Sequence, residues 1–281
     1  MQAFYPYLFV FLWSTGFIGA RYGLPHAEPL TFLLIRYGLV ITLMAGLALV
    51  MDAPWPKKRR QVLHIAVTGV LMHAVYLGGV FVSIKQGLPT AMVSLLAGLQ
   101  PLLTAVISSL LLHETVGGRR WVGLVLGLVG TILVLSGRLQ AGFGFTGILP
   151  ALVALAGITV GTLYQKRFCP AFDWRSGAVI QFVAAAAVTL PVAALTEQLQ
   201  VEPVGQFFFA LAWLVLVLSV GAISLLNHLL RTGTALKVVS LFYLVPVSTA
   251  AIAWAVFGES LSLTACVGMG LAVWGVSLAR R

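Results

Sequence analysis

Several polar and aromatic side chains that can bind a small molecule lie inside long apolar stretches of this sequence. His73 and Tyr76 are three residues apart, so a helix would place both side chains on one face. Trp13 and Ser14 belong to the segment WSTG, near the centre of the first apolar run. The remaining binding candidates are Ser94, Gln100 and Tyr243.

The chemistry of these side chains suits the binding of a zwitterion that has an apolar body. Aromatic rings offer a large apolar surface with a polar tip, and a ring face attracts an ammonium group. Basic, hydroxyl and amide groups can hold a carboxylate. Packing is the alternative role, and it fits Trp13 about equally well. An imidazole without a partner in lipid would be costly, which favours a binding role for His73 and Tyr76.

Acidic side chains, by contrast, are absent from the middle of every apolar run. The seven acidic residues are Glu28, Asp52, Glu114, Asp173, Glu197, Glu202 and Glu259. A carrier of organic cations, or a proton relay built on carboxylates, would need an acidic group at the membrane centre. The sequence also lacks a paired acidic metal motif, a Cys/His cluster and a nucleophile beside a base. We therefore expect no enzyme, no metal and no cofactor.

The composition of the chain requires a membrane environment. Of its 281 residues, 60% are hydrophobic and only 9% are charged, and the mean hydropathy is +1.04. A soluble domain carries roughly a quarter of charged residues, so this chain cannot cover itself with a polar surface. The net charge of +10 comes from basic residues in short gaps between apolar runs. This pattern indicates membrane-protein loops within a lipid bilayer and no nucleic-acid partner.

The apolar runs are long enough for membrane-spanning helices, each of which needs roughly 20 apolar residues. They predict an all-α membrane protein with ten transmembrane helices. The expected spans are 4–22, 30–51, 61–83, 88–112, 118–136, 146–167, 175–196, 206–229, 236–257 and 262–279.

Basic residues predict the orientation of these helices, because they favour the cytoplasmic side. With a cytoplasmic N-terminus, the inner side carries Lys57, Lys58, Arg59, Arg60, Arg119, Arg120, Lys166, Arg167, Arg175, Arg231, Arg280 and Arg281. The outer side then carries Arg21, Lys85 and Arg138. Both termini are therefore expected in the cytoplasm. Arg36 and Lys237 fall inside helices, and we expect Arg36 to extend its charge to the outer interface.

The two halves of the chain align when the sequence is shifted by 145 residues. The matched pairs are Leu99 and Leu244, Pro101 and Pro246, Glu114 and Glu259, Gly123 and Gly268, and Gly130 and Gly275. The shift divides the chain into repeats at 1–138 and 146–281, each with five helices. Because five is odd, the second repeat must insert upside down, which is the inverted-repeat architecture of many secondary transporters.

The repeated prolines weaken their helices at one point each, because proline removes a backbone hydrogen bond. Pro101 and Pro246 are thus candidates for gating positions in the middle of the membrane. The alternative is a static kink that shapes the helix bundle. We interpret Glu114 and Glu259, which follow at the helix ends, as structural interface residues.

The paired phrases LQPLLTAVISSLLLHE and LVPVSTAAIAWAVFGE, followed by the spaced glycines, resemble the EamA family of the drug/metabolite transporter superfamily. The resemblance covers essentially the whole chain, and within the family it looks most similar to YddG-type bacterial amino-acid exporters. It implies a basket of two inverted five-helix repeats around a central cavity. In such a basket, helices one to four and six to nine line the cavity, and helices five and ten lie outside.

The leading hypothesis is a monomeric exporter of amino acids, aromatic and other neutral ones, and of related small metabolites, in the bacterial inner membrane. It would work by alternating access. Burial would keep His73 neutral, and no carboxylate lies at the midplane, so we expect facilitated transport without an obligatory ion. The alternative is a proton-coupled transporter of drugs or of another metabolite, such as a nucleotide sugar.

The predicted topology can be tested by cysteine labelling in intact cells. Single cysteines placed in the loop at 53–60 should resist an impermeant reagent, and those in the loop at 197–205 should react with it. Reaction of the first loop from outside would contradict a cytoplasmic N-terminus.

Overall fold

The computed structural model describes residues 4–88, 90–111, 116–136, 145–169, 171–257 and 262–280, and these are almost entirely helical. The first half contains α1 (Tyr5–Gly23), α2 (Pro29–Val50), α3 (Arg59–Gly69), the π-helix η1 (Val70–Val75), α4 (Tyr76–Lys85), α5 (Thr90–Ala97), α6 (Gln100–Leu111) and α7 (Gly118–Leu135). The second half contains η3 (Phe145–Gly147), α8 (Ile148–Phe168), α9 (Trp174–Thr196), α10 (Gly205–Trp213), the π-helix η4 (Leu214–Ala222), α11 (Ile223–Thr232), α12 (Ala235–Val239), η5 (Ser240–Tyr243), α13 (Leu244–Phe257) and α14 (Leu263–Arg280).

Helix occupies each of the ten ranges that the apolar runs predict. Seven helical stretches of the described residues are long and apolar enough to cross a membrane, namely Pro29–Val50, Arg59–Lys85, Val93–Leu110, Ile148–Phe168, Trp174–Thr196, Gly205–Thr232 and Ala235–Ile252. The all-α prediction is thus confirmed for the described residues. Membrane crossing by α1, α7 and α14 stays a prediction.

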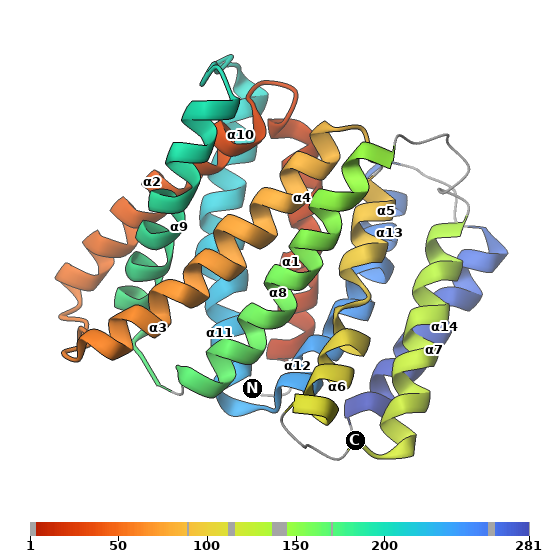
Figure 1. The fold of residues 1–281 in the computed structure, drawn as a ribbon. Helices are drawn as coiled ribbons and strands as arrows, with labels where there is room; N and C mark the ends of the chain where they lie inside the picture. The colour runs from red at the N-terminus through yellow and green to blue at the C-terminus, as the bar shows by residue number, and fades with distance from the viewer. Residues whose placement is uncertain are drawn as a thin grey trace.

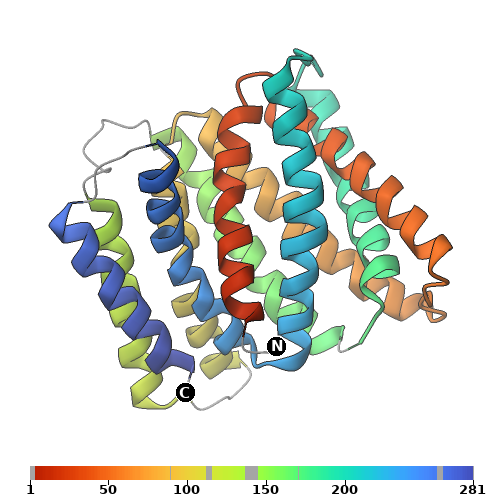
Figure 2. The same ribbon diagram turned by 180° about the vertical axis from the view of Figure 1, so that it is seen from behind.

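The helices form one bundle in which helices of each half pack against helices of the other half (Figures 1 and 2). α1 packs against α10, η4 and α13 of the second half, while α8 packs against α4, η1 and α3 of the first. α2 pairs with α9, and α7 pairs with α14 at the edge of the bundle. The start of α1 and the end of α14 lie at the same end of the bundle (Figure 2). An inverted repeat would produce this packing between the halves, although the inversion itself stays a prediction.

Side chains fasten α2 to α9 at both ends. The Glu197 carboxylate, just after α9, accepts hydrogen bonds from the backbone N–H groups of Leu30 and Thr31, at 2.8 and 2.7 Å. It thereby caps the first turn of α2, whose N–H groups have no partner within the helix. At the other end, Ser176 donates to the Pro54 carbonyl oxygen at 2.8 Å. Asp173 caps α9, and the neighbouring Arg175 guanidinium holds the pKa of its carboxyl below the usual value.

The repeated prolines lie where their helical stretches are interrupted. α5 ends at Ala97, and Pro101 is the second residue of α6. Pro246 is the third residue of α13, directly after the 3₁₀ segment η5. Proline suits the first turn of a helix, where its missing N–H is not needed. Both prolines therefore follow a break in the backbone, and their gating role stays a prediction. Glu114 and Glu259 lie outside the described residues.

Glycines allow α7 and α14 to touch through their backbones. A Cβ atom on Gly268 would lie 2.7 Å from the Gly130 carbonyl oxygen, and one on Gly275 would lie 2.6 Å from the Gly123 carbonyl oxygen. Small residues at such an interface let two helices approach closely in a membrane. The same helix carries a glycine without this role, because a Cβ on Gly270 would meet nothing within 4 Å.

We predict opposite effects for alanine at these two glycines of α14. Gly268→Ala should lower the free energy of unfolding by about 1–3 kcal/mol, because the new methyl group overlaps backbone atoms of α7. Gly270→Ala should leave it unchanged or raise it, since alanine favours helix. Thermal unfolding of the two purified variants in one detergent measures the difference. Equal melting temperatures would contradict the close backbone contact.

Candidate functional site

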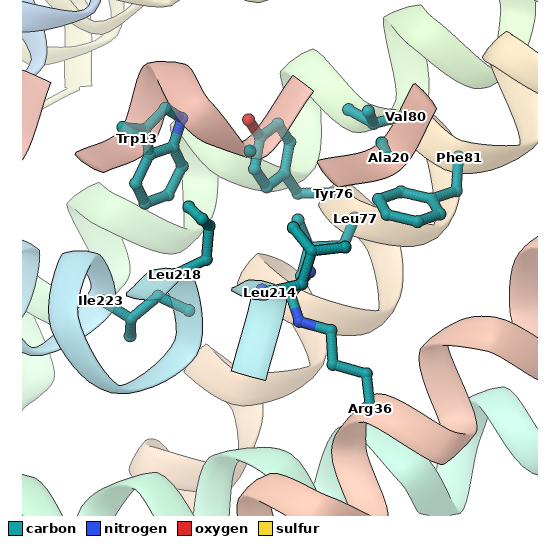
Figure 3. Close-up of a pocket in the computed structure, with 11 residues that line it drawn as sticks. Trp13, Ala20, Arg36, Tyr76, Leu77, Val80, Phe81, Leu214, Leu218 and Ile223 are labelled. Atoms are coloured by element: carbon teal, nitrogen blue, oxygen red, sulfur yellow. The ribbon is translucent and has the colours of Figure 1, made fainter. Parts of the chain in front are cut away.

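A narrow cavity of about 50 Å³ lies between the two halves of the bundle (Figure 3). Its walls come from α1, α2, α4, η4 and α11. The lining residues are Trp13, Gly16, Ala20, Arg36, Tyr76, Leu77, Val80, Phe81, Leu214, Leu218 and Ile223. Small residues on α1 leave the space open: a Cβ atom on Gly16 would already lie 3.2 Å from Leu218. This space is smaller than most small-molecule sites, so the lining side chains must move apart to admit a solute.

Two aromatic side chains predicted from the sequence meet at this cavity. The rings of Trp13 and Tyr76 are stacked, with centroids 6.3 Å apart and an angle of 17° between their planes. Phe242 packs edge-on against Trp13 at 5.2 Å, and Phe9 supports Trp13 at 5.2 Å. These contacts hold the indole in place, so it presents a fixed apolar surface to the cavity.

Arg36 contributes the charged group of the cavity wall. Its side chain is only 2% exposed, and its Nε donates a hydrogen bond to Ser219 Oγ at 3.0 Å. Figure 3 shows the side chain extending from α2 toward Leu214. The expectation that Arg36 extends to the outer interface was therefore wrong. Ser219, on η4 of the other half, offers a partner inside the bundle, and the cavity provides room for the guanidinium.

A buried cation of this kind requires compensation. Taking it out of water costs on the order of several kcal/mol when no opposite charge pairs with it. The acidic residues in the described part of the chain lie at or beyond helix ends, and none forms an ion pair with Arg36. The guanidinium can therefore bind a carboxylate or another anionic group that enters from outside.

The two π-helices shape the cavity. Shifted by 145 residues, η1 corresponds to residues 215–220, which lie within η4. A π-helix widens the helix by one residue, and such segments are frequent at functional sites. Each is supported by a hydroxyl group: Tyr37 donates to the His73 carbonyl oxygen at 2.8 Å, and Ser219 to that of Leu214 at 3.1 Å.

His73 does not line the cavity with Tyr76. Its ring stacks on Phe182 of α9 at 4.1 Å, and neither ring nitrogen has a hydrogen-bond partner among the described residues. The expected common face assumes α-helical geometry, in which residues three apart are neighbours. The π-helical turn at η1 changes this spacing, so the two rings point to different surroundings. A binding role for His73 stays a prediction.

The other predicted side chains lie away from the cavity lining. Ser14 bonds to the Val10 and Val245 carbonyl oxygens and so joins α1 to α13. Gln100 donates to Thr162 Oγ1 at 3.3 Å and joins α6 to α8. Tyr243 is fully buried, with its ring against Gly127. Ser94 lies on α5 and is partly buried.

Sequence patterns missed two residues of the site, Arg36 and Ser219. A signal for Arg36 was present, because it is a charge within an apolar run and aligns with the polar Gln181 in the other half. Ser219 gave none, since a serine inside an apolar helix is ordinary. For a metal, the described residues offer no group of three His, Cys, Asp or Glu side chains.

Known proteins resemble this chain along most of its length. An inner membrane transporter of Escherichia coli K12, YedA, which is itself uncharacterized, is 28% identical over 95% of this chain and 86% of its own. A transporter of Chlamydia muridarum, named for S-adenosylmethionine and S-adenosylhomocysteine, is 25% identical over 99% of this chain and 91% of its own length. One solved crystal structure superposes with a TM-score of 0.79 over 98% of this chain and 94% of its own, at 23% identity, which shows a shared fold.

The match to a family is more specific than these pairwise similarities. The model of the EamA-like transporter family matches residues 3–136 and, a second time, residues 145–281. Because these matches cover both halves, the chain belongs to the EamA-like transporter family and is a multi-pass membrane transporter.

Proposed function

We propose that this protein exports neutral amino acids, the aromatic ones above all, and related small metabolites across the bacterial inner membrane by alternating access. The observation that carries the proposal is the cavity between the halves, where Trp13 and Tyr76 face the same space as the buried Arg36. An aromatic wall suits an apolar side chain, and a guanidinium suits a carboxylate. An aromatic wall beside a guanidinium is the combination that we expect of a YddG-type exporter of aromatic amino acids.

The arrangement of the cavity supports an alternating-access mechanism. Its lining on α1 and α4 runs from Trp13 and Tyr76 toward the ends of these helices that lie away from the chain termini. At the end of the bundle where the termini lie, Gln165 donates to Asn227 Oδ1 at 2.8 Å, and Lys166 donates to the Leu230 carbonyl oxygen at 2.7 Å. These bonds join α8 to α11. With both termini cytoplasmic, the cavity lies toward the outer face and these hydrogen bonds lie toward the inner face.

Facilitated transport by a monomer, without an obligatory ion, is the simplest form of this mechanism. Proton antiport needs a titrating group that each side of the membrane reaches in turn. The lining contains no carboxylate or imidazole, and its basic group, Arg36, stays protonated in proteins. The imidazole of His73 is buried between η1 and α9. Inverted repeats would exchange the roles of the two halves during the cycle.

Sulfur-containing nucleosides are a second candidate substrate class. The support is the chlamydial relative that is named as an S-adenosylmethionine and S-adenosylhomocysteine transporter. Both solutes combine an amino-acid group with a flat ring system, and the aromatic wall and the guanidinium would suit S-adenosylhomocysteine, which lacks the sulfonium charge of S-adenosylmethionine. A substrate panel should therefore contain both classes.

Purified protein in proteoliposomes tests the proposed function directly. Radiolabelled phenylalanine or tryptophan should equilibrate across the membrane faster than in empty vesicles. With equal amino acid on both sides and the potential clamped, an imposed pH or sodium gradient should produce no net accumulation. Accumulation against the amino-acid gradient would contradict facilitated transport, and equilibration no faster than in empty vesicles would contradict amino-acid export.

The aromatic wall generates a second prediction. Tyr76→Ala should raise the KM for aromatic substrates by about tenfold or more, because a central aromatic contact is lost. His73→Ala should lower the transport rate with a smaller change in KM, because the stack on Phe182 is lost but no cavity surface changes. Tyr7→Ala, at an exposed site on α1, serves as the control. If Tyr76→Ala and His73→Ala both transport at the wild-type rate at equal membrane levels, these two side chains have only a packing role.

A further inference from the structure

We propose that Arg36 and Ser219 form a binding subsite for the carboxylate of the transported solute, and that this subsite selects against solutes of net positive charge. The proposal rests on the proposed function in that a solute enters the cavity. It goes further by naming the group that the protein recognises and the class of solute that it rejects.

The geometry of Arg36 suits a carboxylate. A guanidinium has five N–H donors in a planar fork. One of them, on Nε, is used by Ser219 at 3.0 Å, and among the described residues no other acceptor bonds the group. This single bond fixes the direction of the fork and leaves the Nη donors for a ligand. Two parallel hydrogen bonds to one carboxylate are the preferred arrangement for arginine.

The protein supplies no counter-ion of its own among the described residues. Glu197 accepts its hydrogen bonds from the first turn of α2, and Glu28 accepts one from the Gln198 nitrogen. Glu202 pairs with His26, and Asp173 pairs with Arg175. These carboxylates are thus engaged at helix ends and in loops. A buried, oriented and uncompensated cation that lines a cavity points to an anionic group on the solute.

The opposite part of the lining decides which solutes fit around that carboxylate. Trp13 and Tyr76 present ring surfaces, and the remaining lining is aliphatic or small, apart from Phe81. Once the lining side chains move apart to admit it, a flat apolar body would lie against the rings while its carboxylate reaches Arg36. A second positive charge on the solute meets a cation and no acid. Neutral zwitterions and monocarboxylates should bind, whereas amines, amino-acid amides and the sulfonium compound S-adenosylmethionine should not.

The subsite also joins the two halves of the protein. Arg36 lies on α2, and Ser219 lies on the π-helix η4 of the second half. A carboxylate on the guanidinium is therefore bound at the interface whose rearrangement alternating access requires. Ser219 is a positioning residue here, because it orients the fork through Nε.

Ligand-induced thermal stabilisation of the purified protein separates recognition from transport. Titrations use phenylalanine, 3-phenylpropionate, phenylalaninamide and phenethylamine, which differ in charge but share the phenyl ring. Wild-type protein should be stabilised by the two carboxylates and bind the amide and the amine at least about tenfold more weakly. Arg36→Gln should lose about tenfold or more in carboxylate affinity, and Arg36→Lys should lose less, because it keeps the charge but not the fork. Leu39→Ala, on the lipid side of the same helix, is the control.

The possible outcomes distinguish this proposal from the proposed function. Wild-type affinity of Arg36→Gln for carboxylates would overturn the subsite, as would equal binding of the acid and the amide by the wild type. If Arg36→Gln does not fold, the comparison of ligands on the wild type still decides. If amino acids do not bind but 3-phenylpropionate or S-adenosylhomocysteine does, and S-adenosylmethionine does not, amino-acid export fails while the carboxylate subsite stands. Preference for S-adenosylmethionine would overturn the charge selection.

Discussion

Lipid offers no hydrogen-bond partner to a backbone, so every irregular turn within a spanning helix needs a partner from the protein. Two such turns, η1 and η4, occur at equivalent positions of the two halves. In each, a side-chain hydroxyl donates to a backbone carbonyl oxygen: Tyr37 to His73, and Ser219 to Leu214. Each hydroxyl group thus adds a hydrogen bond to the widened turn. The shape of the central cavity depends on them in turn.

The lining of the cavity depends on the directions in which the widened turns orient the side chains in and beside them. Tyr76 comes directly after η1 and faces Trp13, whereas His73, inside η1, stacks on Phe182. In η4, Leu214 and Leu218 line the cavity, and the hydroxyl of Ser219 reaches both a backbone carbonyl and Arg36. One serine therefore supports the irregular backbone and orients the charged group. Loss of the π-helical turn would affect both at once.

The pairing of the two halves places this cavity at their boundary. α7 and α14 touch through glycines, and α2 is fastened to α9 at both of its ends. Between these pairs, α1 and α8 each pack against helices of the other half. A solute in the cavity contacts both halves, since Trp13, Arg36 and Tyr76 come from the first and Leu218 from the second. Under the proposed mechanism, binding and the exchange between two arrangements of the halves would be coupled through the same residues.

Local composition determined the class of the protein, the helical ranges and the duplication, because apolar length, flanking charge and a constant shift of 145 residues are properties of the chain itself. It also indicated Trp13 and Tyr76, which line the cavity, since aromatic side chains beside polar ones stand out in an apolar run. Tertiary structure alone decided that Arg36 turns inward, because its partner Ser219 is 183 residues away. It also moved His73 from the expected common face, since a π-helical turn alters the spacing that an α-helix would give. The direction of a buried polar side chain is set by the partners that packing brings to its depth, and neighbouring residues in the sequence do not contain that information.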